Sequence, residues 1–320
     1  FSSFRMFFAY GGSFIALFLW EPLTNMFGGY KTPEGWFWGM VVIASACFVM
    51  FILCFLLTKE HLKTISTVSV GNDFKSLLSN KPWWLLIGAA LCSNLFNTVR
   101  GATVAYFFLD IIGSDVSLSF FGIMFLFYSG LFLGVGEVSN MAGVALCVPI
   151  ANKLGKKTTF ILVNAALFVL SIAFFFVPCT PSGFWTMLIL QIVISIFTGI
   201  MSPLIWSMYA DVSDYAELKF KTASTGLIFS SASMAQKFGG AIGGAAVLWL
   251  LSGFGYITDS AQIDAGATQP ESALLVLRWL MSFIPAAVAA LAIVVVWFYP
   301  LTTKRINEIS SELKKVRAID

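Results

Sequence analysis

The chain has 320 residues, of which 58% are hydrophobic and 11% are charged; its mean hydropathy is +0.88 and its net charge is +3. Soluble domains carry about one quarter charged residues, so this composition excludes an ordinary soluble domain and indicates an integral membrane protein. The five cysteines lie in apolar stretches without a CxxC pair, and the single histidine, His61, lies in a charged segment. A disulfide framework, a metal site and a His-based triad therefore have little support, and no cofactor or nucleic-acid partner is expected.

Long apolar segments predict membrane-spanning helices, because roughly 20 helical residues cross a hydrocarbon core of about 30 Å. The apolar runs are continuous and do not alternate with polar residues, which excludes a transmembrane β-barrel. The predicted fold class is therefore an all-α integral membrane protein. Its eight transmembrane helices are expected at residues 4–28, 34–57, 83–108, 126–151, 158–177, 183–209, 222–251 and 273–299.

Basic residues gather in alternate connections between these segments. Lysine and arginine are concentrated in 58–82, 152–157, 210–221 and 300–320, whereas the intervening connections hold few of them. The positive-inside rule places basic connections in the cytoplasm. We therefore expect a multi-pass protein of the cell membrane whose first helix runs outward and whose C-terminus is cytoplasmic.

The basic segment 58–82 divides the predicted helices into two and six. This division is natural for a carrier built from two six-helix halves, with four helices preceding the chain. The domain prediction assigns 1–57 to the end of the first half, 58–82 to the inter-half loop and 83–299 to the second half. The remaining segment, 300–320, is amphipathic and is expected to lie along the cytoplasmic surface.

The stretch 117–152 does not fit a single span. It is too long for one transmembrane helix and too short for two. Gly130, Gly134 and Gly136 could break it, which predicts an interfacial or re-entrant piece before the true span.

Lys237 lies near the middle of the predicted helix 222–251, where a charge in hydrocarbon costs a few kcal/mol or more unless it is paired or hydrated. Ser230, Ser233 and Gly244 share its face, which predicts a polar stripe toward the protein interior. Lys237 then borders a substrate or ion path, or forms a structural ion pair that fixes helix packing. Two overlapping GxxxG patterns predict close helix packing at Gly239, Gly240, Gly243 and Gly244.

A second polar group lies on the helix predicted at 83–108. Asn94, Asn97 and Arg100 occupy adjoining faces there, and amides and guanidinium groups hydrogen-bond the hydroxyls of polar ligands. Hydrogen bonding between helices explains these residues equally well.

Two acidic residues, Glu21 and Glu137, lie in the outer thirds of their predicted helices. Each could line a cavity or reach the outer interface. The sequence does not choose between these alternatives.

Three motifs in the second half carry a family resemblance. They are DVSDYAE at 211–217, GLIFS at 226–230 and QKFG at 236–239. Together they resemble the glycoside–pentoside–hexuronide:cation symporter family, the branch of the major facilitator superfamily that includes the melibiose carrier. Weaker landmarks agree along the chain: Arg5-Met6, NTVRG at 97–101, ANKLGKK at 151–157 and FYPL at 298–301.

The resemblance implies a twelve-helix fold of which this chain matches the fifth to twelfth helices. It implies sugar uptake driven by Na⁺ or H⁺ through alternating access, in a protein expected to be monomeric in the bilayer. Asp211, Asp214, Tyr215 and Glu217 match a motif that closes the inner gate. Lys237 matches a lysine beside the cation and sugar sites, whose carboxylate partners lie on helices one, two and four of the family.

The match departs from the family pattern at two positions near the gate. Ala216 stands where a glycine is usual, and Ala223 stands where an arginine is common. Lys219 and Lys221 could substitute in the ion pairing of the gate.

The function predicted from the sequence is therefore sugar:cation symport. A carrier of lysophospholipid or another amphipathic solute, and a non-transporting membrane sensor or scaffold, are the alternatives. An enzyme is least supported, because no Ser/His/Asp set, HExxH motif or carboxylate dyad is visible. The residues expected to form the substrate and cation site are Lys237, Ser233, Arg100, Asn97, Asn94 and Trp206.

Overall fold

The computed structural model describes residues 2–29, 32–59, 70–113, 118–120, 123–125, 128–220, 225–258 and 268–317. Over these ranges eight helical segments are long and apolar enough to cross a membrane, as the sequence predicts. The helices are α1 (Ser2–Met26), α2 (Pro33–Leu57), α3 (Val70–Leu78), α4 (Lys81–Phe107), α5 (Tyr128–Leu154), α6 (Lys156–Phe175), α7 (Gly183–Phe220), α8 (Thr225–Gly253), α10 (Glu271–Met281), α11 (Phe283–Trp297) and α12 (Thr303–Arg317).

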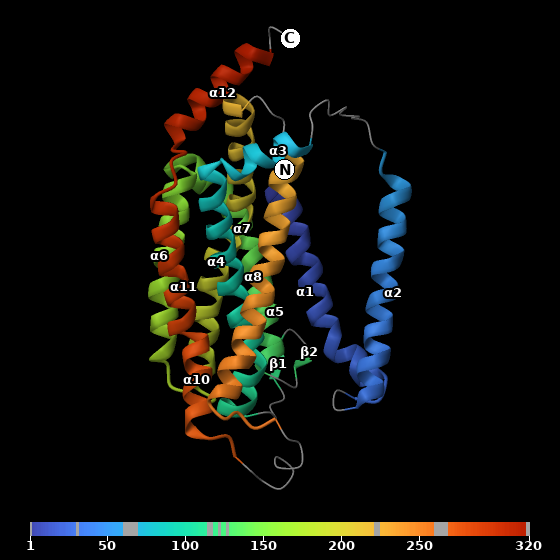
Figure 1. Cartoon of the computed structure of the whole chain (residues 1–320). Coiled ribbons are helices and arrows are strands. Elements are labelled where there is room, and N and C mark those ends of the chain that lie inside the picture. The colour runs from blue at the N-terminus through green and yellow to red at the C-terminus, as the bar shows by residue number, and fades with distance from the viewer. Residues whose placement is uncertain are drawn as a thin grey trace.

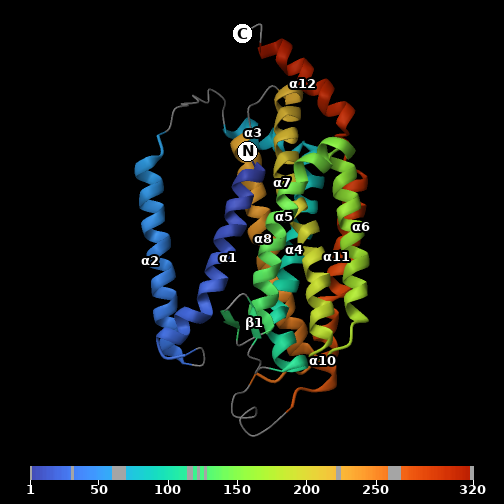
Figure 2. The same cartoon turned by 180° about the vertical axis from the view of Figure 1, so that it is seen from behind.

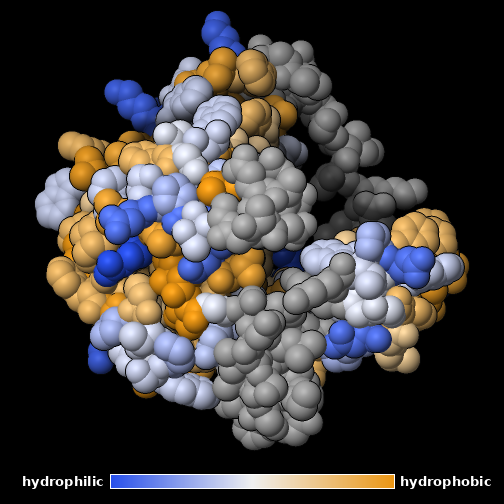
Figure 3. Space-filling model, turned by 90° about the horizontal axis from the view of Figure 1, so that it is seen from below, coloured by the Kyte–Doolittle hydropathy of each residue, from blue (hydrophilic) through white to orange (hydrophobic). Residues whose placement is uncertain are grey.

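Helices α4 to α8 with α10 and α11 form one bundle (Figures 1 and 2). Helix α1 packs against α5 at the side of this bundle, and α2 contacts α1 while standing apart from the other helices. Seen from below, hydrophobic side chains cover much of the molecule's perimeter (Figure 3). Such a perimeter suits contact with lipid tails.

The connections alternate between the two ends of the bundle (Figure 1). Helix α3, the α5–α6 junction, the end of α7 and the whole of α12 lie at one end, and these are the segments where lysine and arginine gather. The α1–α2 turn and the start of α10 lie at the other end. The basic connections predicted from the sequence therefore share one end of the molecule.

Helix α7 is longer than predicted. The acidic motif at 211–217 was expected in a loop, but the helix continues to Phe220, with 38 residues in all. The loop prediction is wrong because this stretch contains neither proline nor glycine, and its Val212 and Ala216 are buried. At 1.5 Å per residue, α7 exceeds the hydrocarbon thickness and projects beyond the bundle, as Figure 1 shows.

The stretch before α5 also differs from its prediction. Two short antiparallel strands, β1 (Leu118–Phe120) and β2 (Ile123–Phe125), precede the helix. Helix α5 then runs unbroken through the three glycines that were expected to interrupt it. The re-entrant helical piece is therefore absent from the described part of this stretch. One reason is packing: a Cβ on Gly136 would lie 3.2 Å from the Ser195 hydroxyl of α7, so this glycine permits close approach of the helices.

The last predicted span is two helices joined at Ser282. Helix α10 ends at Met281 and α11 begins at Phe283. Pro285 has no backbone N–H, so the carbonyl of Met281, four residues earlier, lacks its usual helical donor. This explains why the helix breaks here.

Helix α12 is amphipathic, as predicted, and Ile309 and Leu313 on its apolar face are buried against the bundle core. It contacts the projecting end of α7. The apolar face of this helix is therefore covered by protein, whereas the sequence analysis expected it to lie on the membrane surface.

The GxxxG prediction is confirmed for one of its two patterns. A Cβ on Gly239 would lie 2.8 Å from Asn94, and one on Gly243 would lie 2.9 Å from Thr98, so both glycines admit α4 closely. Gly240 and Gly244 have more room. A Cβ on Gly240 would lie 3.7 Å from the Thr98 hydroxyl, and one on Gly244 would have no atom within 4 Å.

Candidate functional site

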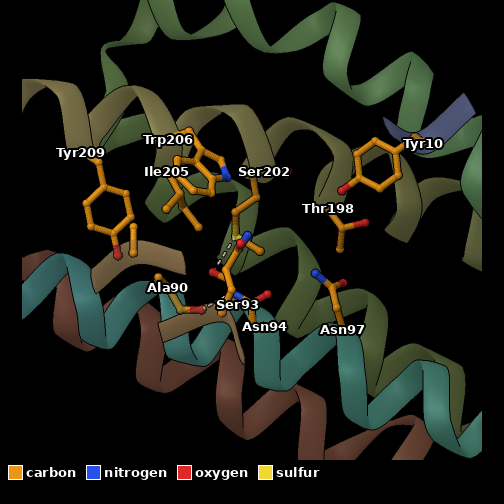
Figure 4. Close-up of a pocket in the computed structure, with 13 residues that line it drawn as sticks. Tyr10, Ala90, Ser93, Asn94, Asn97, Thr198, Ser202, Ile205, Trp206 and Tyr209 are labelled. Atoms are coloured by element: carbon orange, nitrogen blue, oxygen red, sulfur yellow. Dashed lines mark hydrogen bonds between the residues drawn. The ribbon is translucent and has the colours of Figure 1, made fainter. Parts of the chain in front are cut away.

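A polar cavity of about 130 Å³ lies between α1, α4, α7 and α8. Figure 4 shows Ser93, Asn94 and Asn97 of α4 facing Thr198, Ser202 and Trp206 of α7 across it, with Tyr10 entering from α1. We call this space the first cavity.

A second cavity of about 220 Å³ adjoins it between α1, α4, α5 and α7. Tyr10, Asn97 and Thr198 line both spaces, so they form one continuous polar region. The second cavity adds Glu137, Asn140 and Gln191 to the polar lining, together with Arg100, Ser195 and several apolar residues.

The two asparagines predicted for the site lie on the cavity wall. Asn94 is half-buried, and its amide donates a hydrogen bond of 2.7 Å to the Ala90 carbonyl of its own helix. Asn97 is exposed and makes no hydrogen bond with other described residues. Its amide can both donate to and accept from a ligand in either cavity.

Trp206 lines the first cavity, but its ring is largely covered. It stacks on Phe229 at 6.0 Å between ring centroids, and the Arg5 guanidinium lies 4.8 Å from the indole ring. Only 9% of its surface is exposed. The ring can present an edge to a ligand, and stacking on a sugar requires the exposed Arg5 side chain to move.

Arg100 hydrogen-bonds neighbouring helices, which the sequence analysis gave as the alternative to ligand binding. Its guanidinium donates to the Met281 carbonyl and, at 2.7 Å, to Gln191 Oε1, and it lies 5.0 Å from the Phe174 ring. The first of these acceptors is the carbonyl that Pro285 leaves without a helical partner. Arg100 therefore joins α4 to α6, α7 and α10, although it also contributes to the wall of the second cavity.

Lys237 and Ser233 are exposed on α8 and line neither cavity. Ser230 of the same stripe is exposed as well. Among the described residues no helix covers this stripe, because α8 packs on α4 through its opposite, glycine-bearing face; the interior position of the stripe in the whole protein stays a prediction. Lys237 forms no ion pair with another described residue.

The acidic motif at the end of α7 is joined to the start of α6. Both carboxylate oxygens of Asp211 accept hydrogen bonds of 2.7 Å from Lys156 Nζ, which also donates to the Ser207 carbonyl at 3.2 Å. The Lys156 side chain is 30% exposed and the Asp211 side chain is 10% exposed, so this pair is mostly shielded from water. The described ionic partner of Asp211 is therefore Lys156.

The other motif residues are less buried. Lys219 donates to the Tyr215 hydroxyl at 2.9 Å, whereas Lys221 lies outside the described residues. Asp214 and Glu217 are half-buried. These side chains therefore remain near the surface of the projecting end of α7.

Lys157 ties α6 to the end of α11. Its Nζ donates hydrogen bonds of 2.7 Å to the carbonyls of Trp297, the last residue of that helix, and Tyr299, just beyond it. A lysine there satisfies carbonyls that the helix leaves unpaired. Burial raises the pKa of Tyr299 well above its ordinary value, and the nearby Asp211 carboxylate adds to the rise.

We expect Asp211→Asn to lower the free energy of unfolding by about 1–3 kcal/mol, because the half-buried Lys156 loses a buried ionic partner. Thermal unfolding in detergent measures this loss. Lys153→Ala is the matched control, since this lysine of the same junction is exposed. Equal melting temperatures for Asp211→Asn and wild type would contradict a stabilising pair.

Sequence reasoning missed several cavity residues: Tyr10, Asn140, Gln191 and Thr198. A signal was present on α7, where Gln191, Ser195, Thr198 and Ser202 recur at spacings of one helical turn within an apolar helix. The structure also decides the position of Glu137, which lines the second cavity. The side chain of Glu21 lies outside the described residues.

Comparison with known proteins bears out the resemblance seen in the motifs. The chain is 30% identical to the inner membrane symporter YicJ of Escherichia coli (strain K12), over 97% of this chain and 64% of that protein. It is 28% identical to the putative glycoside/cation symporter YagG of the same organism, over 99% and 65%. It is 29% identical to the isoprimeverose transporter of Lactiplantibacillus pentosus, over 82% and 53%. The chain thus spans less than two thirds of the length of these relatives. A model of the MFS/sugar transport protein family matches residues 1–303, and the chain therefore belongs to that family.

Proposed function

We propose that this chain is the larger part of a cation-coupled sugar symporter. The observation that carries the proposal is the polar region formed by the two cavities, which residues of membrane-spanning helices line. Its amides and hydroxyls can donate and accept hydrogen bonds, as the many hydroxyls of a sugar require. A wall of this kind suits a sugar better than the acyl chain of a lysophospholipid.

The mechanism proposed is alternating access. Helices α1 and α2 are the last two of an N-terminal half, and the bundle from α4 to α11 is the C-terminal half of a twelve-helix carrier. The halves rock about the cavities between them, and the gradient of Na⁺ or H⁺ drives uptake. The carrier works as a monomer, with its basic end and α12 in the cytoplasm.

Two charged features have roles in this mechanism. The exposed side chain of Lys237 faces the N-terminal half and pairs with a carboxylate there, which offsets the cost of its charge in the membrane. The Lys156–Asp211 pair, at the end of α7, holds the inner gate together with Asp214, Tyr215 and Glu217. Movement of α7 during gating would strain or break this pair.

The test is sugar uptake by the protein expressed from its native gene and reconstituted in proteoliposomes. We expect Asn97→Ala to weaken sugar binding about 5- to 100-fold, because the loss of a ligand hydrogen bond costs roughly 1–3 kcal/mol. Since Asn97 makes no hydrogen bond with other described residues, the melting temperature should not change.

Asn152→Ala is the matched control, because it removes the same amide from an exposed position outside both cavities. Labelled glycosides and a labelled lysophospholipid are compared as substrates. Uptake of the lysolipid alone, or equal affinity of the two alanine variants for sugar, would refute the proposed site.

A further inference from the structure

An apolar groove of about 400 Å³ runs along α10 and α11, across the break at Ser282. The proposed transport site leaves this groove unused, because its residues line neither polar cavity. Every described side chain that lines it is hydrophobic: Trp279, Phe283, Ile284, Ala287, Val288 and Leu291. We call it the α10–α11 groove.

The groove follows one stripe of these two helices. Trp279, Phe283, Ala287 and Leu291 are spaced four residues apart, which places them along one face. Ala287 is the smallest of the four and leaves room between the larger Phe283 and Leu291. The stripe extends over about 18 Å, at 1.5 Å per residue. One leaflet is about 15 Å deep, half of a hydrocarbon core of about 30 Å. The groove therefore has the length of one acyl chain.

The groove belongs to an edge of the bundle that other helices leave open. Helix α11 packs on α4 and α6, on the side of the bundle away from α2 (Figures 1 and 2). Because the other helices of the proposed carrier continue from α1 and α2, they leave this edge to the membrane. The six lining side chains are also few for a second copy of the chain, since a stable protein interface uses about 20–30 residues a side.

An arginine lies at one end of the groove. The Arg278 guanidinium lies 4.5 Å from the centre of the Phe175 ring, and the ring of Phe283 lies 4.6 Å from the same ring. Phe175 is the last residue of α6, so Arg278 lies at the level where this helix ends, away from the basic end of the molecule. The neighbouring Trp279 is of a type enriched at the boundary between membrane and water.

The charge of Arg278 has no ionic partner among the described residues. Its guanidinium donates one hydrogen bond of 2.8 Å, to the Phe175 carbonyl, out of the five N–H groups that it carries. The side chain is half-buried, so the remaining donors can reach a ligand at the surface. Guanidinium groups bind phosphate through paired N–H groups. A phosphate at the end of an acyl chain therefore matches both parts of this surface.

We propose that the α10–α11 groove binds an anionic phospholipid, with its phosphate on Arg278 and one acyl chain along the stripe. An anionic headgroup binds better than a zwitterionic one, because Arg278 supplies a positive charge that no described carboxylate offsets. The bound chain covers the break at Ser282 from the membrane, while Arg100 satisfies the Met281 carbonyl from within the bundle. Binding therefore stabilises the bent arrangement of the two helices.

The test uses the protein expressed from its native gene, purified in detergent and freed of lipid. Phosphatidylglycerol and phosphatidylethanolamine with identical acyl chains are titrated, and bound lipid is counted by native mass spectrometry. We expect about fivefold tighter binding of phosphatidylglycerol, the effect of one basic side chain on an anionic lipid. The melting temperature should rise with its concentration, because the lipid binds the folded state.

Two substitutions separate the headgroup from the chain. Arg278→Gln should abolish the preference for phosphatidylglycerol and leave the binding of phosphatidylethanolamine unchanged within about twofold. Lys153→Gln, which removes an exposed charge at the other end of the molecule, is its control and should keep the preference.

Ala287→Phe fills the groove and should weaken the binding of both lipids at least about tenfold, because the acyl chain loses its contact area. Its control is Ala145→Phe, the same change at an exposed position of α5, which should bind both lipids as wild type does. Melting temperatures without lipid show whether each variant is folded.

Several outcomes would overturn the inference. A preference for phosphatidylglycerol that survives Arg278→Gln would exclude the phosphate contact, and unchanged binding in folded Ala287→Phe would exclude the groove. Equal stabilisation by inorganic phosphate would show that the acyl chain contributes nothing. A dimer that forms without lipid and is lost in Ala287→Phe would assign the groove to a second copy. Sugar transport enters none of these measurements, so failure of the proposed function would be recognised separately.

Discussion

Gly199→Ala should largely prevent α7 from packing on α5. A Cβ at Gly199 would stand 2.2 Å from the Asn140 carbonyl oxygen, and one at Gly143 would stand 2.1 Å from that of Ile196. These neighbours are backbone atoms of the facing helix, so no side-chain rotation relieves the clash. We expect each alanine to cost about 3 kcal/mol, the upper end of the usual range for an overpacked core, and to displace the Asn140–Thr198 hydrogen bond.

Thermal unfolding and size-exclusion chromatography in detergent measure this effect. Gly134→Ala is the matched control on α5, because no atom lies within 4 Å of the added Cβ. Without a clash, alanine should stabilise the helix by about 0.5–1 kcal/mol. If Gly143→Ala and Gly134→Ala melt at the same temperature, the close contact between α5 and α7 is wrong.

Arg100→Met should destabilise the bundle by about 3 kcal/mol or more. The substitution removes two hydrogen bonds from a charged donor and leaves the buried carbonyl of Met281 without a partner. Arg278→Met is the control, since that arginine also donates to a carbonyl and stacks on a phenyl ring but is only half-buried. We expect its loss to be about 1 kcal/mol.

A double variant tests the physical cause. Pro285→Ala restores a backbone N–H that can reach the Met281 carbonyl, so it should recover part of the stability lost in Arg100→Met. Strict additivity of the two changes would show that the arginine does not replace the missing helical bond. A fall in sugar affinity without any loss of stability would assign Arg100 to the site instead.

The position of each span follows from local sequence. A run of apolar residues long enough to cross the bilayer is a property of one segment. The eight predicted spans therefore appear as helical segments whose ends shift by a few residues, apart from the extension of α7 to Phe220 and the break at Ser282. The amphipathic character of α12 is likewise local. The end of α7 was misjudged because charged residues do not end a helix, and a tertiary partner, α12, covers the apolar side of its extension.

The polar residues show what residue spacing within one helix can and cannot predict. Spacing along one helix tells which residues share a face, and it correctly grouped Asn94 with Asn97. It cannot tell which way that face turns, and the stripe of Lys237 turns away from the cavities because the glycines on the other side of α8 pack on α4. Rotation of a helix is set by packing against its neighbours.

By itself the sequence determined that this protein is a helical membrane protein, and its motifs indicated the family. Tertiary structure alone decided that Arg100 replaces the donor missing at Pro285 and that Asp211 pairs with Lys156. It also decided that Glu137 and Tyr10 line the same cavity. Each of these contacts joins residues far apart in the chain. Their meeting depends on how several helices pack together, which no periodicity within a single segment records.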